Sequence, residues 1–169
     1  MPRSLSVVIM LATALVVATV AVASSPDNRT GKSARHTRTM RLTASSFADR
    51  DFDVRPRGIS LGDNFVATEN LFRGGKKVGE DHGTCEITRL EPKRGKAKTG
   101  GLQCLVTLVL PEGQITLQGA RTAVLASQEP PRFVLAVTGG TGAFRNARGT
   151  VRIVDLNRTD SRLTVRLIG

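Results

Sequence analysis

The sequence contains no tryptophan and no tyrosine, and six phenylalanines make up its whole aromatic content. Proteins that bind single-stranded nucleic acid usually stack bases on aromatic rings, so this shortage argues against that class. The formal net charge of +11 would otherwise favour a nucleic-acid partner. The basic residues are scattered, however, apart from one cluster at 93–98 in an expected hairpin loop. We therefore expect no nucleic-acid partner and a solvated loop tip at that cluster.

Histidine and cysteine are also scarce, with two of each. His36 lies in a polar segment and His82 stands alone, so these residues and the two cysteines lack the ligand spacing of a zinc site. The sequence has no G-x-S-x-G turn, which presents the nucleophile in many serine hydrolases. We therefore expect no metal centre and no Ser–His–Asp catalysis.

Only one apolar run is long, and it lies near the amino end. Leu5–Val22 follows Arg3 and ends in the small-residue sequence Ala21-Val22-Ala23, a pattern typical of a secretory signal peptide. An uncleaved membrane anchor is the alternative, because the run approaches the roughly 20 residues that span a bilayer. We predict a secreted or cell-surface protein without stable membrane insertion after cleavage. Its predicted parts are a signal peptide over 1–23, a flexible basic linker over 24–38 and a folded domain over 39–169.

The two cysteines fit an exported protein with one disulfide. A hairpin whose loop centres near residues 94–95 pairs residues whose numbers sum to about 189, which is the sum for Cys85 and Cys104. The two side chains are therefore predicted to lie opposite each other and to form a disulfide. Such a bridge, closing a loop of 20 residues, would add roughly 3 kcal/mol in the chain-entropy model. A pair of buried thiols is the alternative.

The folded domain shows repeated alternation of apolar and polar residues and almost no helical period. Eight strands are predicted, over Met40–Ala48, Asn64–Phe72, Val78–Leu90, Leu102–Leu110, Gln114–Thr122, Phe133–Val137, Thr150–Leu156 and Leu163–Ile168. An antiparallel sheet of this length hides its edges most directly by closing on itself. The sequence therefore predicts an all-β fold, an eight-stranded antiparallel β-barrel. An immunoglobulin-like sandwich is the alternative, but it usually has a core tryptophan.

Residues 137–149 form a glycine-rich string, Val-Thr-Gly-Gly-Thr-Gly-Ala-Phe-Arg-Asn-Ala-Arg-Gly. In a dinucleotide-binding fold, such a turn follows the first strand and brings backbone N–H groups to a pyrophosphate. Here Arg145 stands in place of the third glycine, and only 20 residues follow Gly149. We interpret the string as a tight loop between antiparallel strands. Positive φ and close backbone approach are expected at glycines 139, 140 and 142.

Four motifs occur in a fixed order, namely Gly62-Asp63-Asn64-Phe65, Leu71–Gly79, Leu110–Thr116 and the glycine-rich string. In order and spacing they resemble the allene oxide cyclase barrel-like family, which is similar to plant dirigent proteins. The resemblance covers about residues 40–169 and implies an eight-stranded barrel around a hydrophobic cavity. It implies that the cavity holds a small apolar molecule and guides its cyclisation or stereoselective coupling without a cofactor.

Two properties stay open at this point. If the barrel is catalytic, the resemblance implies an isomerase- or cyclase-like enzyme. The alternative is a non-catalytic secreted barrel that binds an apolar ligand or acts at the cell surface. The plant relatives are often trimers, so the resemblance also allows a homo-oligomer.

Catalysis in such a barrel needs acids, or a bound water, at the cavity. Asp49, Asp51 and Asp53 repeat at every second position, so they share one face of an extended chain, although a solvated face is the alternative. Glu69 shares a face with Phe65 and Ala67, and Asp155 shares one with Val151 and Ile153. The predicted catalytic candidates are Asp49, Asp51, Glu69, Asp155 and Arg145.

The remaining candidates are ligand-binding residues. Arg145 and Arg148 are expected at the rim of the barrel, where they would pair with the carboxyl groups or with a substrate carboxylate. Thr141 is expected to donate a hydrogen bond from the same loop. The predicted ligand-binding residues are Phe65, Phe133, Thr141 and Arg148.

Overall fold

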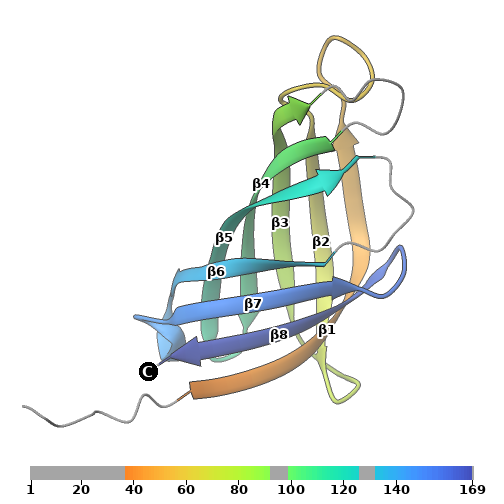
Figure 1. The fold of residues 1–169 in the computed structure, drawn as a ribbon. Helices are drawn as coiled ribbons and strands as arrows, with labels where there is room; N and C mark the ends of the chain where they lie inside the picture. Colours follow the sequence, from red (N-terminus) through yellow and green to blue (C-terminus); the bar gives the residue numbers. More distant parts are fainter. Residues whose placement is uncertain (1–36, 92–98, 126–131, 169) are drawn as a thin grey trace, which may run out of the picture. The chain divides into compact units, whose positions relative to one another are not determined.

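The computed structural model describes residues 37–91, 99–125 and 132–168 (Figure 1). The predicted signal peptide and nearly all of the predicted linker lie outside these residues. Eight strands form one closed antiparallel barrel in chain order, as predicted. The strands are β1 (Thr37–Phe52), β2 (Asn64–Arg73), β3 (Lys76–Glu91), β4 (Thr99–Leu110), β5 (Gly113–Val124), β6 (Arg132–Gly140), β7 (Arg148–Asp155) and β8 (Asp160–Ile168). A short 3₁₀ helix, η1 (Gly142–Phe144), lies between β6 and β7.

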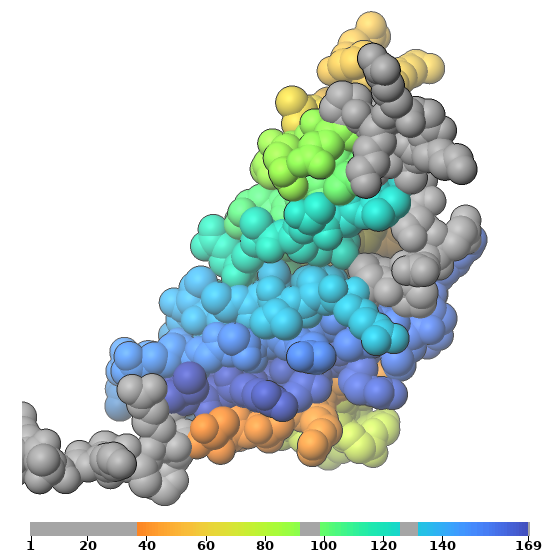
Figure 2. Space-filling model, in the orientation of Figure 1, coloured from red at the N-terminus to blue at the C-terminus, as the bar shows by residue number. Residues whose placement is uncertain are grey.

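The barrel closes where β8 pairs with β1, from Thr37 opposite Ile168 to Ser45 opposite Asp160. In Figure 2 the bands from turquoise β5 through blue β7 to the orange start of β1 lie directly against one another. Closure satisfies the backbone groups that an edge strand would expose. No helix among the described residues is long and apolar enough to cross a membrane.

Most strands are longer than the sequence predicts, and β1 shows the reason. A bulge between Ser46 and Ala48 interrupts the register with β2. It leaves Phe47 with 56% of its surface exposed and changes which positions face inward. The alternation in the sequence therefore stops at the bulge, whereas the backbone pairing continues to Phe52.

Side chains fill only one half of the barrel. The buried core residues belong to the strand halves near the β2–β3, β4–β5 and β6–β7 turns, and they include Leu42, Leu71, Leu108, Ile115, Leu117, Leu135, Val151 and Val165. Phe144 of η1 is 2% exposed and packs in the same cluster, so η1 covers that end. Figure 1 shows η1 and the end of β8 at one end and the β7–β8 turn at the other. The second half is therefore the part of the barrel that is free to bind a ligand.

The glycine-rich string is packed against the filled end, and part of it differs from the prediction. Gly139 and Gly140 extend β6 without positive φ, whereas Gly142 has φ 57° and Gly149 has φ 143°. Close approach does occur, because a Cβ on Gly140 would lie 2.4 Å from the carbonyl oxygen of Gln114. The string therefore shapes the fold at this end.

The predicted disulfide is confirmed. Cys85 of β3 lies opposite Cys104 of β4, and their sulfurs are 2.03 Å apart. Cys104 is fully buried, and Cys85 lines the open half of the barrel. The bridge thus ties two neighbouring strands at the wall of that half.

Candidate functional site

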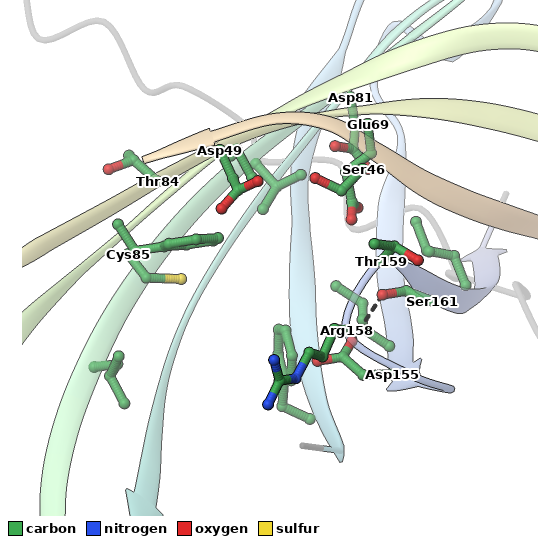
Figure 3. A pocket seen from close by; sticks show the side chains of 18 of the residues that line it. Ser46, Asp49, Glu69, Asp81, Thr84, Cys85, Asp155, Arg158, Thr159 and Ser161 are labelled. Atoms are coloured by element: carbon green, nitrogen blue, oxygen red, sulfur yellow. Dashed lines mark hydrogen bonds between the residues drawn. The ribbon is translucent and has the colours of Figure 1, made fainter. Parts of the chain in front are cut away.

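A cavity of about 300 Å³ occupies the open half of the barrel. We call it the acid cavity, because the carboxyl groups of Glu69, Asp81 and Asp155 lie in its wall (Figure 3). Its volume is at the lower end of the range for small-molecule sites. Apolar side chains form much of the remaining wall, namely Phe65, Ala67, Leu102, Val106, Phe133, Ile153 and Leu163.

Glu69 and Asp81 lie directly opposite each other on β2 and β3. Strand alternation turns Asp81 inward together with Gly83 and Cys85, and only 4% of Asp81 is exposed. Figure 3 shows Glu69, Asp81 and Ser46 gathered on one side of the cavity. The two carboxyl groups are hydrogen-bonded to each other.

This pair holds a proton near neutral pH. Burial, then the charge of Glu69 and a hydrogen bond to it, raise the pKa of Asp81 to about 8. Burial raises the pKa of Glu69, while the hydrogen bond from Asp81 opposes that rise. The cause is that two adjacent carboxylates, one buried and one half-buried, repel each other and lose hydration. The pair therefore shares one proton near neutral pH.

Asp155 of β7 presents a third carboxyl group to the cavity. Its Oδ1 accepts a hydrogen bond of 2.8 Å from the hydroxyl of Ser161, which Figure 3 shows as a dashed line. Burial raises the pKa of Asp155, while the Ser161 hydrogen bond and the charge of Arg121 lower it. Asp155 also raises the pKa of Glu69 through its charge, so the carboxyl groups act on one another.

Arg121 of β5 is a half-buried cation in this wall, and the exposed Arg158 also lines the cavity. The guanidinium carbon of Arg121 lies 4.5 Å from the centre of the Phe133 ring, so the cation lies over the ring in a cation–π contact. Burial lowers the pKa of Arg121, and the charge of Asp155 opposes that shift. The cavity thus contains acidic groups and one half-buried cation within a mostly apolar lining.

The structure brings five of the predicted site residues together in the acid cavity, namely Asp49, Glu69, Asp155, Phe65 and Phe133. Asp51 faces the same way as Asp49, because it pairs with Phe65 on β2, but it lines a groove nearer the mouth. Asp53 lies in that groove as well, and its carboxylate accepts a hydrogen bond of 3.2 Å from the backbone N–H of Gly58.

The other three predicted residues lie at the filled end. Arg145 and Arg148 line a separate concavity beside Phe144 and Leu167, and strand direction puts them at the opposite end from Asp155 and Glu69. They are therefore not near the carboxyl groups with which the sequence paired them. The Thr141 hydroxyl accepts a hydrogen bond of 3.0 Å from the backbone N–H of Gln114, which ties the loop to β5.

Sequence reasoning missed Asp81 and Arg121, although a signal for Asp81 was present. The Gly74-Gly75 turn pairs residues whose numbers sum to about 149, and Glu69 and Asp81 sum to 150. The same register argument that joined the cysteines would have placed these carboxyl groups together. A signal for Arg121 was present too, because Arg121 shares a face of β5 with the buried Ile115 and Leu117 and interrupts it. Among the described residues, no group of three or more His, Cys, Asp or Glu side chains is placed to hold a metal ion.

The fold and the sequence together define the family. Residues 42–167 match the model of the allene oxide cyclase barrel-like domain. The chain therefore belongs to this family, as the motifs predicted. A search of curated proteins found no significant match.

Solved structures with the same fold handle small organic molecules according to their names. A pyocyanin demethylase is 26% identical, with a TM-score of 0.65 over 76% of this chain and 98% of that chain. A pterocarpan synthase dirigent protein is 15% identical, with a TM-score of 0.58 over 86% of this chain and 96% of that chain. The Diels-Alderase AbmU from Streptomyces koyangensis is 16% identical, with a TM-score of 0.59 over 81% of this chain and 70% of that chain. The last two likenesses are evidence of the shared fold.

Proposed function

We propose that this protein is an enzyme that binds a small, mostly apolar organic molecule in the acid cavity and transfers a proton to or from it. The observation that carries the proposal is the pair of the half-buried Glu69 and the buried Asp81, whose proton remains bound up to a pH of about 8. A barrel that only bound an apolar ligand would have no need for this costly burial of acids.

The chemistry follows from the two protonation states. The Asp81 carboxyl group donates its proton to a basic atom or an electron-rich carbon of the substrate, and becomes a carboxylate. The Glu69 carboxylate accepts a proton from another position, and the pair then exchanges the proton back to its starting arrangement. Proton transfers of this kind isomerise a double bond or promote ring closure, and the apolar lining limits competing water.

The similarity to pyocyanin demethylase supports a planar ring compound as the first substrate class to examine. Phe65 and Phe133 both line the acid cavity, and flat aromatic walls favour flat ligands. Pyocyanin itself is therefore the first probe, followed by smaller hydroxylated and N-alkylated ring compounds.

The test is an exchange assay in D2O, in which mass spectrometry follows both conversion of each probe and deuterium incorporation. We expect wild-type protein to exchange or convert at least one probe. We expect Asp81→Asn to slow that reaction by about 10²- to 10⁴-fold, the usual contribution of a general acid. Glu80→Gln is the matched control, because Glu80 is the neighbouring β3 residue and bonds outward to Lys77. Equal rates in wild type and Asp81→Asn would refute the proposal.

The same assay separates the non-catalytic alternative. A barrel that only carries a ligand would bind a probe, as measured by calorimetry, yet produce neither exchange nor product. Asp81→Asn would then leave ligand binding unchanged, and neither wild type nor variant would show deuterium exchange or product.

The site of action is a further part of the proposal. A disulfide across the barrel wall is typical of proteins that fold outside the reducing cytoplasm. We therefore propose an extracytoplasmic location, for which release of residues 1–23 from the mature protein, detected by intact mass, is the direct test.

A further inference from the structure

Arg121 has an unusual environment for an arginine. It lines the acid cavity, and burial lowers its pKa, so the protein holds a poorly hydrated cation there. The charge of Asp155 acts on it, but no described carboxylate forms an ion pair with it. The carboxylate of Asp155 instead accepts the Ser161 hydroxyl.

One donor of Arg121 has no acceptor. Its Nε–H is buried, and it has no hydrogen-bond partner in the part of the chain that the structure describes. A buried donor without an acceptor destabilises the folded protein, so such groups in native proteins commonly face a ligand or a water. The orphaned donor can therefore donate a hydrogen bond to an acceptor atom of a molecule bound in the cavity.

The guanidinium of Arg121 is restrained by its neighbour Phe133. Its carbon lies 4.5 Å from the centre of the Phe133 ring, which is a cation–π contact. Phe133 also lines the cavity, so a flat ligand that contacts this ring would have its edge near Arg121. The acceptor would then be an oxygen at the edge of that ligand.

The acidic pair belongs to other strands of the same cavity. Glu69 and Asp81 come from β2 and β3, whereas Arg121 and Phe133 come from β5 and β6. A molecule in the cavity therefore meets a proton donor and acceptor on one part of the wall and a cation on another. Charge that develops when a proton leaves a conjugated ring can move to an oxygen beside the cation.

We propose that Arg121 binds the oxygen of a planar conjugated substrate, and that this oxygen carries negative charge as a phenolate or enolate. This inference rests on the proposed function and names the substrate class of the same cavity. Arg121 selects the substrate and stabilises the anion, while Glu69 and Asp81 move the proton.

The test uses the full chain and two probes that share one ring. 4-Nitrophenol ionises near neutral pH. In 4-nitroanisole a methyl ether replaces the phenol hydroxyl, so this probe does not ionise. Hexanoate is the third probe, an anion without a ring. Calorimetry gives the affinities, and the absorbance of the nitrophenolate reports the ionisation of the bound phenol.

We expect wild-type protein to bind nitrophenolate about 10- to 100-fold more tightly than nitroanisole, as one charge-assisted hydrogen bond would give. Arg121→Gln should remove that preference, raise the pKa of the bound nitrophenol and leave nitroanisole binding unchanged. Circular dichroism verifies that the variant is folded. Asp81→Asn should keep the preference while losing deuterium exchange.

Several results would overturn the inference. Wild-type protein without a preference for nitrophenolate would do so, whatever the variants show. A folded Arg121→Gln protein that keeps the preference, or an Asp81→Asn protein that loses it, would assign the selection to other residues. Hexanoate bound as tightly as nitrophenolate would remove the planar ring from the substrate class. Loss of exchange in Asp81→Asn alongside any of these results would leave the proposed function standing.

Discussion

At the scale of single residues, the fold gives two neighbouring carboxyl groups different properties. Glu80 is partly exposed, and its hydrogen bond of 2.8 Å from Lys77, together with the Lys77 charge, lowers its pKa. Asp81, the next residue on β3, faces the interior beside Glu69 and keeps its proton to a pH of about 8. Because neighbouring residues of a strand face opposite sides, Glu80 is a solvated ion and Asp81 is a candidate general acid.

The raised pKa of Asp81 predicts how stability depends on pH. Between pH values of about 4 and 8, the folded protein binds the Asp81 proton and the unfolded chain does not. The free energy of unfolding therefore falls as pH rises through that window, by at most about 1.4 kcal/mol per pH unit from this group. Asp81→Asn should flatten that slope, as measured by urea unfolding at several pH values. An equal slope in both proteins would show that Asp81 titrates normally.

At the scale of elements, the strands were predictable wherever one face is buried and the other solvated. β8 alternates almost perfectly, with Ser161, Leu163, Val165 and Leu167 buried, and its predicted range, Leu163–Ile168, lies within the observed strand. The second half of β1 was less predictable, because the bulge at Phe47 changes the inward set and the inward residues become acidic. Gly139 and Gly140 were assigned to a loop, since glycine is rare in strands, yet they continue β6.

The glycine-rich string gives a prediction about stability. Gly149 has φ 143°, and a Cβ there would lie 1.9 Å from the carbonyl oxygen of Arg166. Gly149→Ala should therefore destabilise the protein by about 2 kcal/mol or more. Gly139→Ala is the matched control, because its Cβ would come no closer than 3.4 Å, to Thr116 Oγ1, and should change stability little. The measurement is thermal unfolding of the two variants. Equal melting temperatures would show that Gly149 is not required for stability.

The disulfide gives a second prediction at this scale. It closes a loop with a sequence separation of 19, so its loss should cost roughly 3 kcal/mol and lower Tm by about 10 °C. The measurement compares wild type with the Cys85→Ala/Cys104→Ala double variant, each with and without reductant. Reductant should lower the Tm of the wild type and leave that of the variant unchanged. A wild type that melts like the variant under oxidising conditions would show that the bridge adds no stability.

At the scale of the whole molecule, the barrel is divided into a filled half and an open half. The alternating apolar residues near η1 form the core that holds the fold. The acid cavity occupies the other half, where the inward positions include Glu69, Asp81, Arg121 and Asp155. The division lets the core stabilise a site whose buried charges would otherwise oppose folding.

This division also explains which site residues could be predicted. Glu69 and Asp155 could be found because each breaks an apolar face within its own strand. Arg145 and Arg148 could not be placed by the same reasoning. Their distance from the cavity depends on which end of the barrel the core fills, and that depends on the inward side chains of all eight strands. The cation–π contact of Arg121 with Phe133 depends on contacts between β5 and β6, which no single strand reveals.

The central claim is that the acid cavity holds a proton near neutral pH on Asp81. Carbon-13 NMR of the side-chain carboxyl carbon, with the signal assigned by comparison with Asp81→Asn, measures this protonation directly as pH is varied. We expect the Asp81 signal to titrate with a midpoint near a pH of about 8. A midpoint near 3.8, the ordinary pKa of an aspartate, would contradict the claim, because Asp81 would then be an ordinary carboxylate.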